Sequence, residues 1–357
     1  MKFLRKIRQI FKSPPPFPLE SVIYEVTPAC NLSCLQCYNV WKDDVDYSRE
    51  QLPAVQAKAL IRKAIQQTGC SDFTFSGGEP CCREDLEELV RTAVDLNCQV
   101  ALITNGTLLT RKRIESLVQA GVELFELPLN SSVAKTHDQL AGKAGSFDKV
   151  VQAATELAEL EQDVAFVFVS TRINQGHFKD ALDLGIALGA RSFLYNRYNG
   201  GGQYHRQPEK LMPSLETLHE DLAYAQNMCS EYGLAIGASI AMPPCLINTA
   251  AFPDVGFGFC AAGTSTAYYT LDPMGNLRPC NHTPTILGNL STSTFAQMVA
   301  SNKMKEFTKA RPQLCSGCKL EEQCLGGCKA AAEVCYGDIT HPEPFLYLNR
   351  NQIKPPT

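Results

Sequence analysis

Three cysteines near the amino end carry the first chemical signal. The stretch CNLSCLQCY places Cys30, Cys34 and Cys37 directly after the apolar run SVIYEVTPA. No secretion signal precedes them, so we expect a reducing compartment, where metal ligation or reactive thiols are favoured over disulfides. A structural zinc ion takes four protein ligands, and these three cysteines have no obvious fourth. Three thiolates on a four-iron cluster would leave one iron open to another ligand.

A second group of cysteines lies toward the carboxyl end. Eight of the 16 cysteines fall between 245 and 335. Disulfide staples would be spread through a small domain, whereas these residues gather in one region, so we favour metal ligation. From residue 240 onward the sequence reads as short strands and turns rich in Gly, Pro and Cys. A region with so little apolar core usually depends on metals for its stability.

Charge and hydropathy exclude several classes of protein. The net charge is −4, which gives no general argument for nucleic-acid binding. No apolar run reaches the roughly 18 residues that a membrane-spanning helix requires. The start, MKFLRKIRQIFKSPPPFP, is basic but lacks the continuous apolar segment of a signal peptide. The expected location is therefore the cytoplasm.

The first twelve residues contain five basic residues and no acidic ones. Five apolar residues would share one face of a helix: Phe3, Leu4, Ile7, Ile10 and Phe11. Such a helix could make a weak contact with an anionic membrane or a partner through residues 1–12. A terminal segment that packs on its own domain is the alternative.

Apolar runs and helical periodicity alternate from residue 20 to about 235. The expected strands are 22–26, 72–76, 99–104, 122–127, 164–169 and 192–196, and helical patterns lie between them, with a last helix at about 214–232. This alternation predicts an α/β fold, a partial (β/α)6 barrel of the TIM type. We therefore divide the chain into a basic tail at 1–19, a barrel at 20–239 and a cysteine-rich domain at 240–357.

Polar motifs follow the first four expected strands. The cysteine triplet follows the first strand, SGGEP the second, TNG the third and PLNSS the fourth. In a parallel sheet the carboxyl ends of the strands meet at one edge, where active sites of such folds lie. The glycine-rich stretch RYNGGGQYH (197–205) is expected to form a loop over the same face.

The triplet followed by the aromatic Tyr38 resembles the motif of the radical S-adenosylmethionine (SAM) superfamily. The resemblance implies that Cys30, Cys34 and Cys37 hold a [4Fe–4S] cluster and take part in catalysis. The open iron would bind SAM, which is cleaved to a 5′-deoxyadenosyl radical that abstracts hydrogen from the substrate.

Three further motifs extend this resemblance to the cofactor site. SGGEP resembles the second-strand motif of the family, in which Gly77 and Gly78 let the backbone approach the methionine part of SAM and Glu79 accepts from its ammonium group. Thr104 and Asn105 match the end of the third strand. Pro128 replaces the usual serine of the fourth motif, so Asn130, Ser131 or Ser170 is expected to contact the ribose instead.

The rear cysteines resemble the seven-cysteine SPASM domain, which carries up to two auxiliary [4Fe–4S] clusters. The resemblance assigns the outer cluster to Cys315, Cys318, Cys324 and Cys335. It assigns the inner cluster to Cys260, Cys280 and Cys328, with Cys245 as a candidate fourth ligand. If Cys245 does not bind there, one inner iron is open to substrate. Zinc is the alternative metal, because Cys-x2-Cys pairs serve both.

Relatives with a SPASM domain mostly modify ribosomal peptides or proteins by crosslinking, epimerisation or oxidation, so a peptide or protein is the expected substrate. Cys82, at the mouth of the site, is a candidate hydrogen donor and His282 a candidate base. Asn281 stands where sulfatase-maturing relatives carry an aspartate, which argues against that activity.

The alternatives are radical modification of a small molecule, such as a tetrapyrrole or a carbohydrate, and a non-catalytic iron–sulfur electron carrier. The chain has no G-x-G-x-x-G dinucleotide motif. Its electrons are therefore expected from a ferredoxin or flavodoxin.

Overall fold

The computed structural model describes residues 17–40 and 47–353. The expected helix at 1–12 lies outside the described residues. Within the described part, the strands form one sheet in the order β11-β10-β9-β1-β2-β3-β4-β5-β6-β7-β8. Their bounds are β1 Ser21–Glu25, β2 Asp72–Ser76, β3 Gln99–Ile103, β4 Val122–Pro128, β5 Asp163–Ser170, β6 Ser192–Arg197, β7 Ala235–Ala238, β8 Gly256–Phe257, β9 Thr270–Leu271, β10 Asn276–Arg278 and β11 Gly288–Asn289.

The six expected strands are confirmed, each within one residue of its predicted ends. Neighbouring strands from β1 to β7 pair in parallel. Phe73 and Phe75 of β2 and Val100 and Leu102 of β3 are almost fully buried, and Thr74 and Ala101, at alternate positions, are partly buried. Strands covered on both faces read as nearly continuous apolar runs, which explains why the sequence located them.

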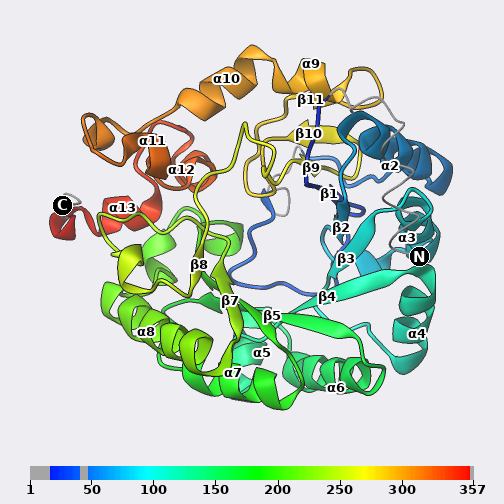
Figure 1. Ribbon diagram of the computed structural model, residues 1–357, viewed down its shortest axis with the longest axis horizontal. Helices are drawn as coiled ribbons and strands as arrows, with labels where there is room; N and C mark the ends of the chain where they lie inside the picture. Colours follow the sequence, from blue (N-terminus) through cyan, green and yellow to red (C-terminus); the bar gives the residue numbers. More distant parts are fainter. Residues whose placement is uncertain (1–16, 41–46, 354–357) are drawn as a thin grey trace.

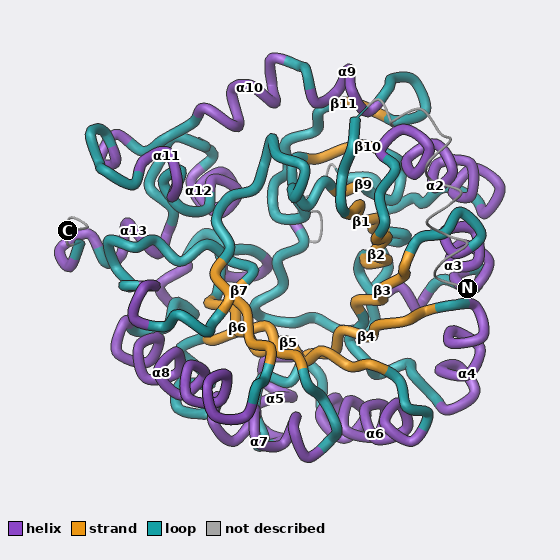
Figure 2. Tube along the Cα trace, viewed as in Figure 1, coloured by secondary structure: helices purple, strands orange, loops and turns teal. Residues whose placement is uncertain are grey.

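Helices follow the barrel strands and cover the outer face of the curved sheet (Figures 1 and 2). Their bounds are α2 Ala54–Thr68, α3 Leu86–Val94, α4 Arg111–Ala120, α5 Ala134–Ala141, α6 Ser146–Glu159, α7 Phe178–Ala187 and α8 Leu215–Tyr232. The last of them shows why the ends fall where they do: the Ser214 hydroxyl accepts from the Thr217 N–H at the start, and Gly233 takes the left-handed conformation at the end.

The region after β7 contributes strands to both edges of the same sheet. Strand β8 pairs with β7, while β9 pairs with β1 and begins the hairpin-like set β9–β11 at the opposite edge. The sequence did not predict β7, which has four residues and a central glycine. The sheet therefore continues past residue 240 instead of stopping with the sixth strand.

The rest of this region consists of short helices that face the open side of the curved sheet (Figure 1). Their bounds are α9 Phe295–Val299, α10 Asn302–Lys309, α11 Glu321–Cys324, α12 Lys329–Tyr336 and α13 Pro344–Leu348. Two of the rear cysteines belong to these helices, since Cys324 ends α11 and Cys335 lies in the last turn of α12. In the described part of the chain, no helix is both long enough and apolar enough to cross a membrane.

Candidate active site

The cysteine triplet lies on the loop that follows β1, and all three side chains are partly buried. Backbone contacts to other elements hold this loop. The Leu35 N–H donates to the Leu140 carbonyl at 2.9 Å, and a Cβ on Gly142 would lie only 2.4 Å from the Ser33 carbonyl oxygen. The start of the triplet is therefore positioned by the barrel itself, at the carboxyl end of the first strand.

The two glycines of SGGEP pack against the same loop. The Gly78 N–H donates to the Thr27 carbonyl at 2.9 Å, and the Glu79 N–H donates to the Ala29 carbonyl at 2.8 Å. A Cβ on Gly77 would lie 2.6 Å from the Thr27 oxygen, and one on Gly78 would lie 2.2 Å from the Ala29 oxygen. Both positions require glycine because the two loops are in backbone contact. Contact between the two loops is therefore a second reason for glycine at these positions, in addition to the predicted close approach of the backbone to SAM.

Glu79 connects three of the predicted cofactor residues. Its buried carboxylate accepts from the Thr104 hydroxyl at 2.6 Å, the Asn105 N–H at 2.7 Å and the Cys81 N–H at 3.0 Å. Burial raises the pKa of this carboxyl, and these hydrogen bonds oppose the rise. The Asn105 side chain then donates to the Asn31 side chain at 2.9 Å, which links the ends of β2 and β3 to the cysteine loop.

Tyr38, directly after the triplet, connects it to the rear region. Its ring stacks on His282 with centroids 4.6 Å apart and an interplanar angle of 5°. Its hydroxyl lies 3.3 Å from the Ser76 hydroxyl, and burial raises its pKa to about 12. Burial, with Arg278 and Arg197 nearby, lowers the pKa of His282 to about 4, so its imidazole is neutral near pH 7. The candidate base therefore lies against the residue that follows the triplet.

The glycine-rich loop lies between the front and rear cysteines. The Asn199 side-chain amide donates to His282 Nδ1 at 2.8 Å and to Cys328 Sγ at 3.1 Å. A Cβ on Gly201 or on Gly202 would lie 2.8 Å from the Cys37 carbonyl oxygen. The sequence predicted a loop over this face, but it gave no role to Asn199, whose importance depends on contacts across 129 positions of the chain.

Two ion pairs with fully buried side chains join barrel strands to the rear region. Arg197, at the end of β6, pairs with Glu343 at 2.6 Å. Glu25, at the end of β1, pairs with Arg278 of β10. Glu343 also accepts from the Cys328 N–H at 3.0 Å, so the first pair directly supports a predicted ligand. The sequence gave no signal for these pairs because their members are far apart in the chain.

The rear thiols fall into two groups. Burial, with Cys328 and Cys260 nearby, raises the pKa of the Cys280 thiol to about 12, so these three thiols lie in one group. The second group lines a small cavity and consists of Cys245, Cys315, Cys318 and Cys324. The position of Cys245 differs from its expected place in the inner group.

The spacing of these thiols does not suit a single metal ion. Among residues 17–40 and 47–353, no three His, Cys, Asp or Glu side chains lie close enough together to hold one ion. The thiolates of a four-iron cluster bind different irons and are spaced more widely than ligands of one zinc. The thiols of each group lie near one another, but too far apart to bind one ion. This arrangement fits four-iron clusters better than zinc.

The remaining predicted site residues are buried or only partly exposed. Asn130 is buried, and its side-chain oxygen accepts from the Val169 N–H at 2.9 Å. Ser170 is fully buried at the end of β5, and the Ser131 hydroxyl contacts His177 Nδ1 at 2.8 Å. Cys82 is partly exposed, and burial, followed by Glu79 and Cys30, raises the pKa of its thiol. The structure thus brings Cys82 beside the triplet, whereas the candidate ribose contacts support the barrel wall.

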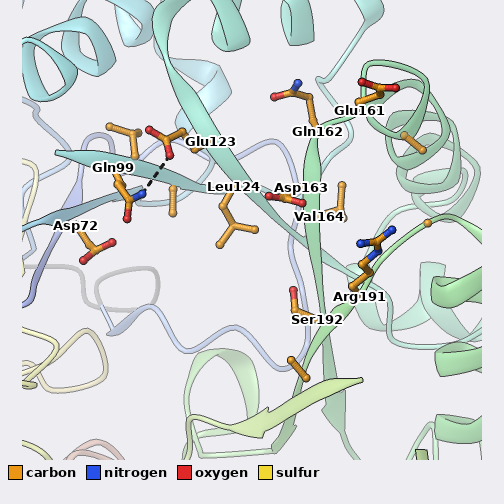
Figure 3. A pocket seen from close by; sticks show the side chains of 15 residues that line it. Asp72, Gln99, Glu123, Leu124, Glu161, Gln162, Asp163, Val164, Arg191 and Ser192 are labelled. Atoms are coloured by element: carbon orange, nitrogen blue, oxygen red, sulfur yellow. Dashed lines mark hydrogen bonds between the residues drawn. The ribbon is translucent and has the colours of Figure 1, made fainter. Parts of the chain in front are cut away.

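A separate cavity of about 850 Å³ lies at the opposite end of the barrel (Figure 3). Its lining includes Asp72, Gln99, Asp163 and Ser192, which are the first residues of β2, β3, β5 and β6. Gln99 donates to Glu123 at 3.4 Å across it. Because the cysteines and SGGEP lie at the carboxyl ends of the strands, this cavity is not part of the candidate active site.

Comparison with known protein families gives two matches. The model of the radical SAM superfamily matches residues 24–185, and that of an iron–sulfur cluster-binding domain matches residues 260–319. The first range contains the triplet and SGGEP, and the second contains four of the rear cysteines: Cys260, Cys280, Cys315 and Cys318.

Similar proteins cover nearly the whole chain. A PqqA peptide cyclase from Rhodopseudomonas palustris is 26% identical, over 92% of this chain and 87% of the relative. An AdoMet-dependent heme synthase from Methanosarcina barkeri is 25% identical, over 91% of this chain and 95% of the relative. The solved structure of Streptococcus suis SuiB bound to precursor peptide SuiA superposes with a TM-score of 0.71 and 17% identity, over 96% of this chain and 79% of SuiB.

Proposed function

The chain belongs to the radical SAM superfamily and carries a C-terminal iron–sulfur cluster-binding domain, and from this premise we propose that it modifies a ribosomally made peptide. It is an enzyme that uses SAM and [4Fe–4S] clusters. When bound, these groups supply radical chemistry that removes hydrogen from a substrate. The observation that carries the peptide proposal is the similarity to a PqqA peptide cyclase over 92% of the chain.

In this proposal the triplet cysteines hold the cluster that binds SAM. The backbone of their loop is held by contacts with Gly78 and Gly142, which restrict where the three thiols can lie. Glu79 would accept from the ammonium group of SAM. Its two oxygens already accept three hydrogen bonds, and a carboxylate has about four lone-pair sites, so one position is left for that contact.

The ends of the sheet offer a peptide a place to bind. In the described part of the chain, β8 and β11 are the edges of the sheet, and each pairs with a neighbour on one side. An extended peptide can add to such an edge through main-chain hydrogen bonds. A ferredoxin or flavodoxin would supply the electrons. The weak membrane or partner contact expected through residues 1–12 concerns a segment outside the described residues.

The experiment is a turnover assay under anaerobic conditions with the reconstituted full chain, SAM and a reductant. The probes are synthetic precursor peptides encoded beside the gene. We expect a peptide to raise the release of 5′-deoxyadenosine and to lose hydrogen, or to take up deuterium from D2O, as followed by mass spectrometry. Cys30→Ala should abolish both signals. Cys229→Ala is the matched control and should leave both unchanged, because Cys229 is a buried residue of α8.

A second candidate is radical modification of a small molecule. It is favoured by the similarity to an AdoMet-dependent heme synthase, which covers 91% of this chain at 25% identity. The same assay with a tetrapyrrole as the probe separates the two. Stimulation by the tetrapyrrole, together with no response to any encoded peptide, would overturn the peptide proposal.

A further inference from the structure

The grouping of the rear thiols in space differs from the grouping that their spacing implies. The spacing assigns Cys335 to the outer set with Cys315, Cys318 and Cys324, and it leaves Cys245 for the inner set. The structure places these two cysteines the other way round, and three independent features of the chain lead to that arrangement.

Cys245 is presented by a rigid turn. The Leu246 and Ile247 N–H groups both donate to the Pro243 carbonyl at 3.0 Å, and Pro244 restricts the backbone inside the turn. Met242 and Ile247, on either side, are fully buried and anchor it, while Cys245 is only partly buried. The turn therefore holds Cys245 at a partly buried position at the border of the core.

The place that Cys245 reaches is the outer group. Pro243, Pro244 and Cys245 line one small cavity together with Cys315, Cys318 and Cys324. The Cys318 N–H donates to the Cys315 carbonyl at 3.0 Å, which closes the Cys-x2-Cys turn. Four thiols thus surround one space.

Cys335 lies with the inner group. Cys328 immediately precedes α12 in an extended conformation, and Cys335 lies in the last turn of that helix, about 10 Å further along its axis. Helical side chains lean toward the amino end, which brings the Cys335 thiol back toward Cys328. On its other side it touches the glycine-rich loop, since a Cβ on Gly200 would lie 2.6 Å from Cys335 Sγ.

We propose that Cys245 completes the outer cluster with Cys315, Cys318 and Cys324, and that Cys335 completes the inner cluster with Cys260, Cys280 and Cys328. Both auxiliary clusters then have four protein ligands. Neither then has an open iron for a substrate. The proposal concerns only the ligands, and it is independent of the identity of the substrate.

Paired substitutions test this partition. Two replaced ligands of one cluster damage one cluster, whereas two replaced ligands of different clusters damage both. The full chain and its variants are reconstituted anaerobically, and intact four-iron clusters are counted by Mössbauer and EPR spectroscopy with an iron assay. We expect about twelve iron atoms in the parent chain, from three clusters.

The expected results separate the two groupings. C245A/C315A and C335A/C328A should each keep one intact auxiliary cluster, whereas C335A/C315A should alter both. The triplet cluster should persist in all of them and shows that the barrel is folded, and C229A should keep all three clusters. The proposal is overturned if C245A/C315A alters both auxiliary clusters, or if C335A/C315A leaves one of them unchanged.

Discussion

The barrel and the cysteine-rich region both gather thiols, but they hold them by different means. The barrel has strands of five to eight residues from β1 to β6 and helices of up to 18 residues. The region after β7 has strands of two or three residues and helices of four to eight. In the barrel, backbone contacts from Gly78 and Gly142 position the cysteine loop. In the rear region the thiols lie on short segments, so cluster binding must supply much of the stability.

The largest expected effect follows from removing the clusters. In iron-free protein, the barrel and the strands paired with it should keep their structure, while the short helices that carry the rear cysteines open. Hydrogen exchange measured by mass spectrometry should accelerate on the order of 10⁴-fold in residues 312–337. Exchange in β2 to β5 should change little. Equal acceleration in both regions would show that they do not differ in this way.

The second effect concerns the contact between the two regions. Glu343→Gln leaves the buried Arg197 guanidinium without its carboxylate and weakens the acceptor of the Cys328 N–H. Breaking a buried pair from one side costs about 3–5 kcal/mol. Anaerobic thermal unfolding of the holoenzyme should therefore shift clearly downward.

Glu159→Gln is the matched control for this substitution. Glu159 pairs with Arg111 at 2.8 Å, but both side chains are exposed, by 63% and 41%. Exposed pairs contribute about 0–1 kcal/mol. If the two variants unfold at the same temperature, the buried pair does not join the regions energetically.

The same contrast explains what the sequence could predict. The six barrel strands were located because parallel strands covered on both faces read as apolar runs, and the motifs at their carboxyl ends located the triplet, SGGEP and TNG. Strands β8 to β11 have two or three residues each, too few for a periodicity to register. Their pairing is decided by distant partners, as is the ion pair between Arg197 and Glu343, which are 146 positions apart.

The ligand grouping shows the same limit more sharply. A spacing motif states which cysteines are available, but not which of them meet in space. Cys245 and Cys315 lie far apart in the sequence but line the same cavity. Their approach depends on the turn at Pro243 and on how the sheet edge positions that turn. Sequence therefore identifies thiol chemistry and leaves the partition to the fold.

The third effect is a pH dependence confined to the barrel. Burial lowers the pKa of His137 to about 4, and nearby Asp138 opposes this shift. A histidine with a lowered folded-state pKa contributes its full stability above its unfolded value near 6.5, and this is lost as pH falls from about 6.5 toward 4. At pH 5 the loss is about 2 kcal/mol, since 1.5 pKa units correspond to about that energy.

His137→Gln should remove this part of the pH dependence. Unfolding of the iron-free chain by urea, measured at pH 7.5 and at pH 5, tests it. The parent should lose more stability between these values than the variant. An unchanged difference would mean that His137 is not the group that titrates. Iron-free protein is used because cluster loss at low pH would otherwise mask the barrel.

The smallest effect concerns Asn199, a residue of the glycine-rich loop whose side chain contacts a predicted ligand of the inner cluster. The Asn199 amide donates to Cys328 Sγ at 3.1 Å, and a hydrogen bond to a ligand sulfur stabilises the extra negative charge of the reduced cluster. Asn199→Leu should therefore lower the midpoint potential of the inner cluster. A difference of about 1 kcal/mol corresponds to about 40 mV for one electron. EPR-monitored redox titration measures it, and the outer cluster is the internal control because Asn199 lies on the inner side. If the potential of the outer cluster shifts instead, Cys328 binds the outer cluster, and the proposed grouping of the rear cysteines is wrong.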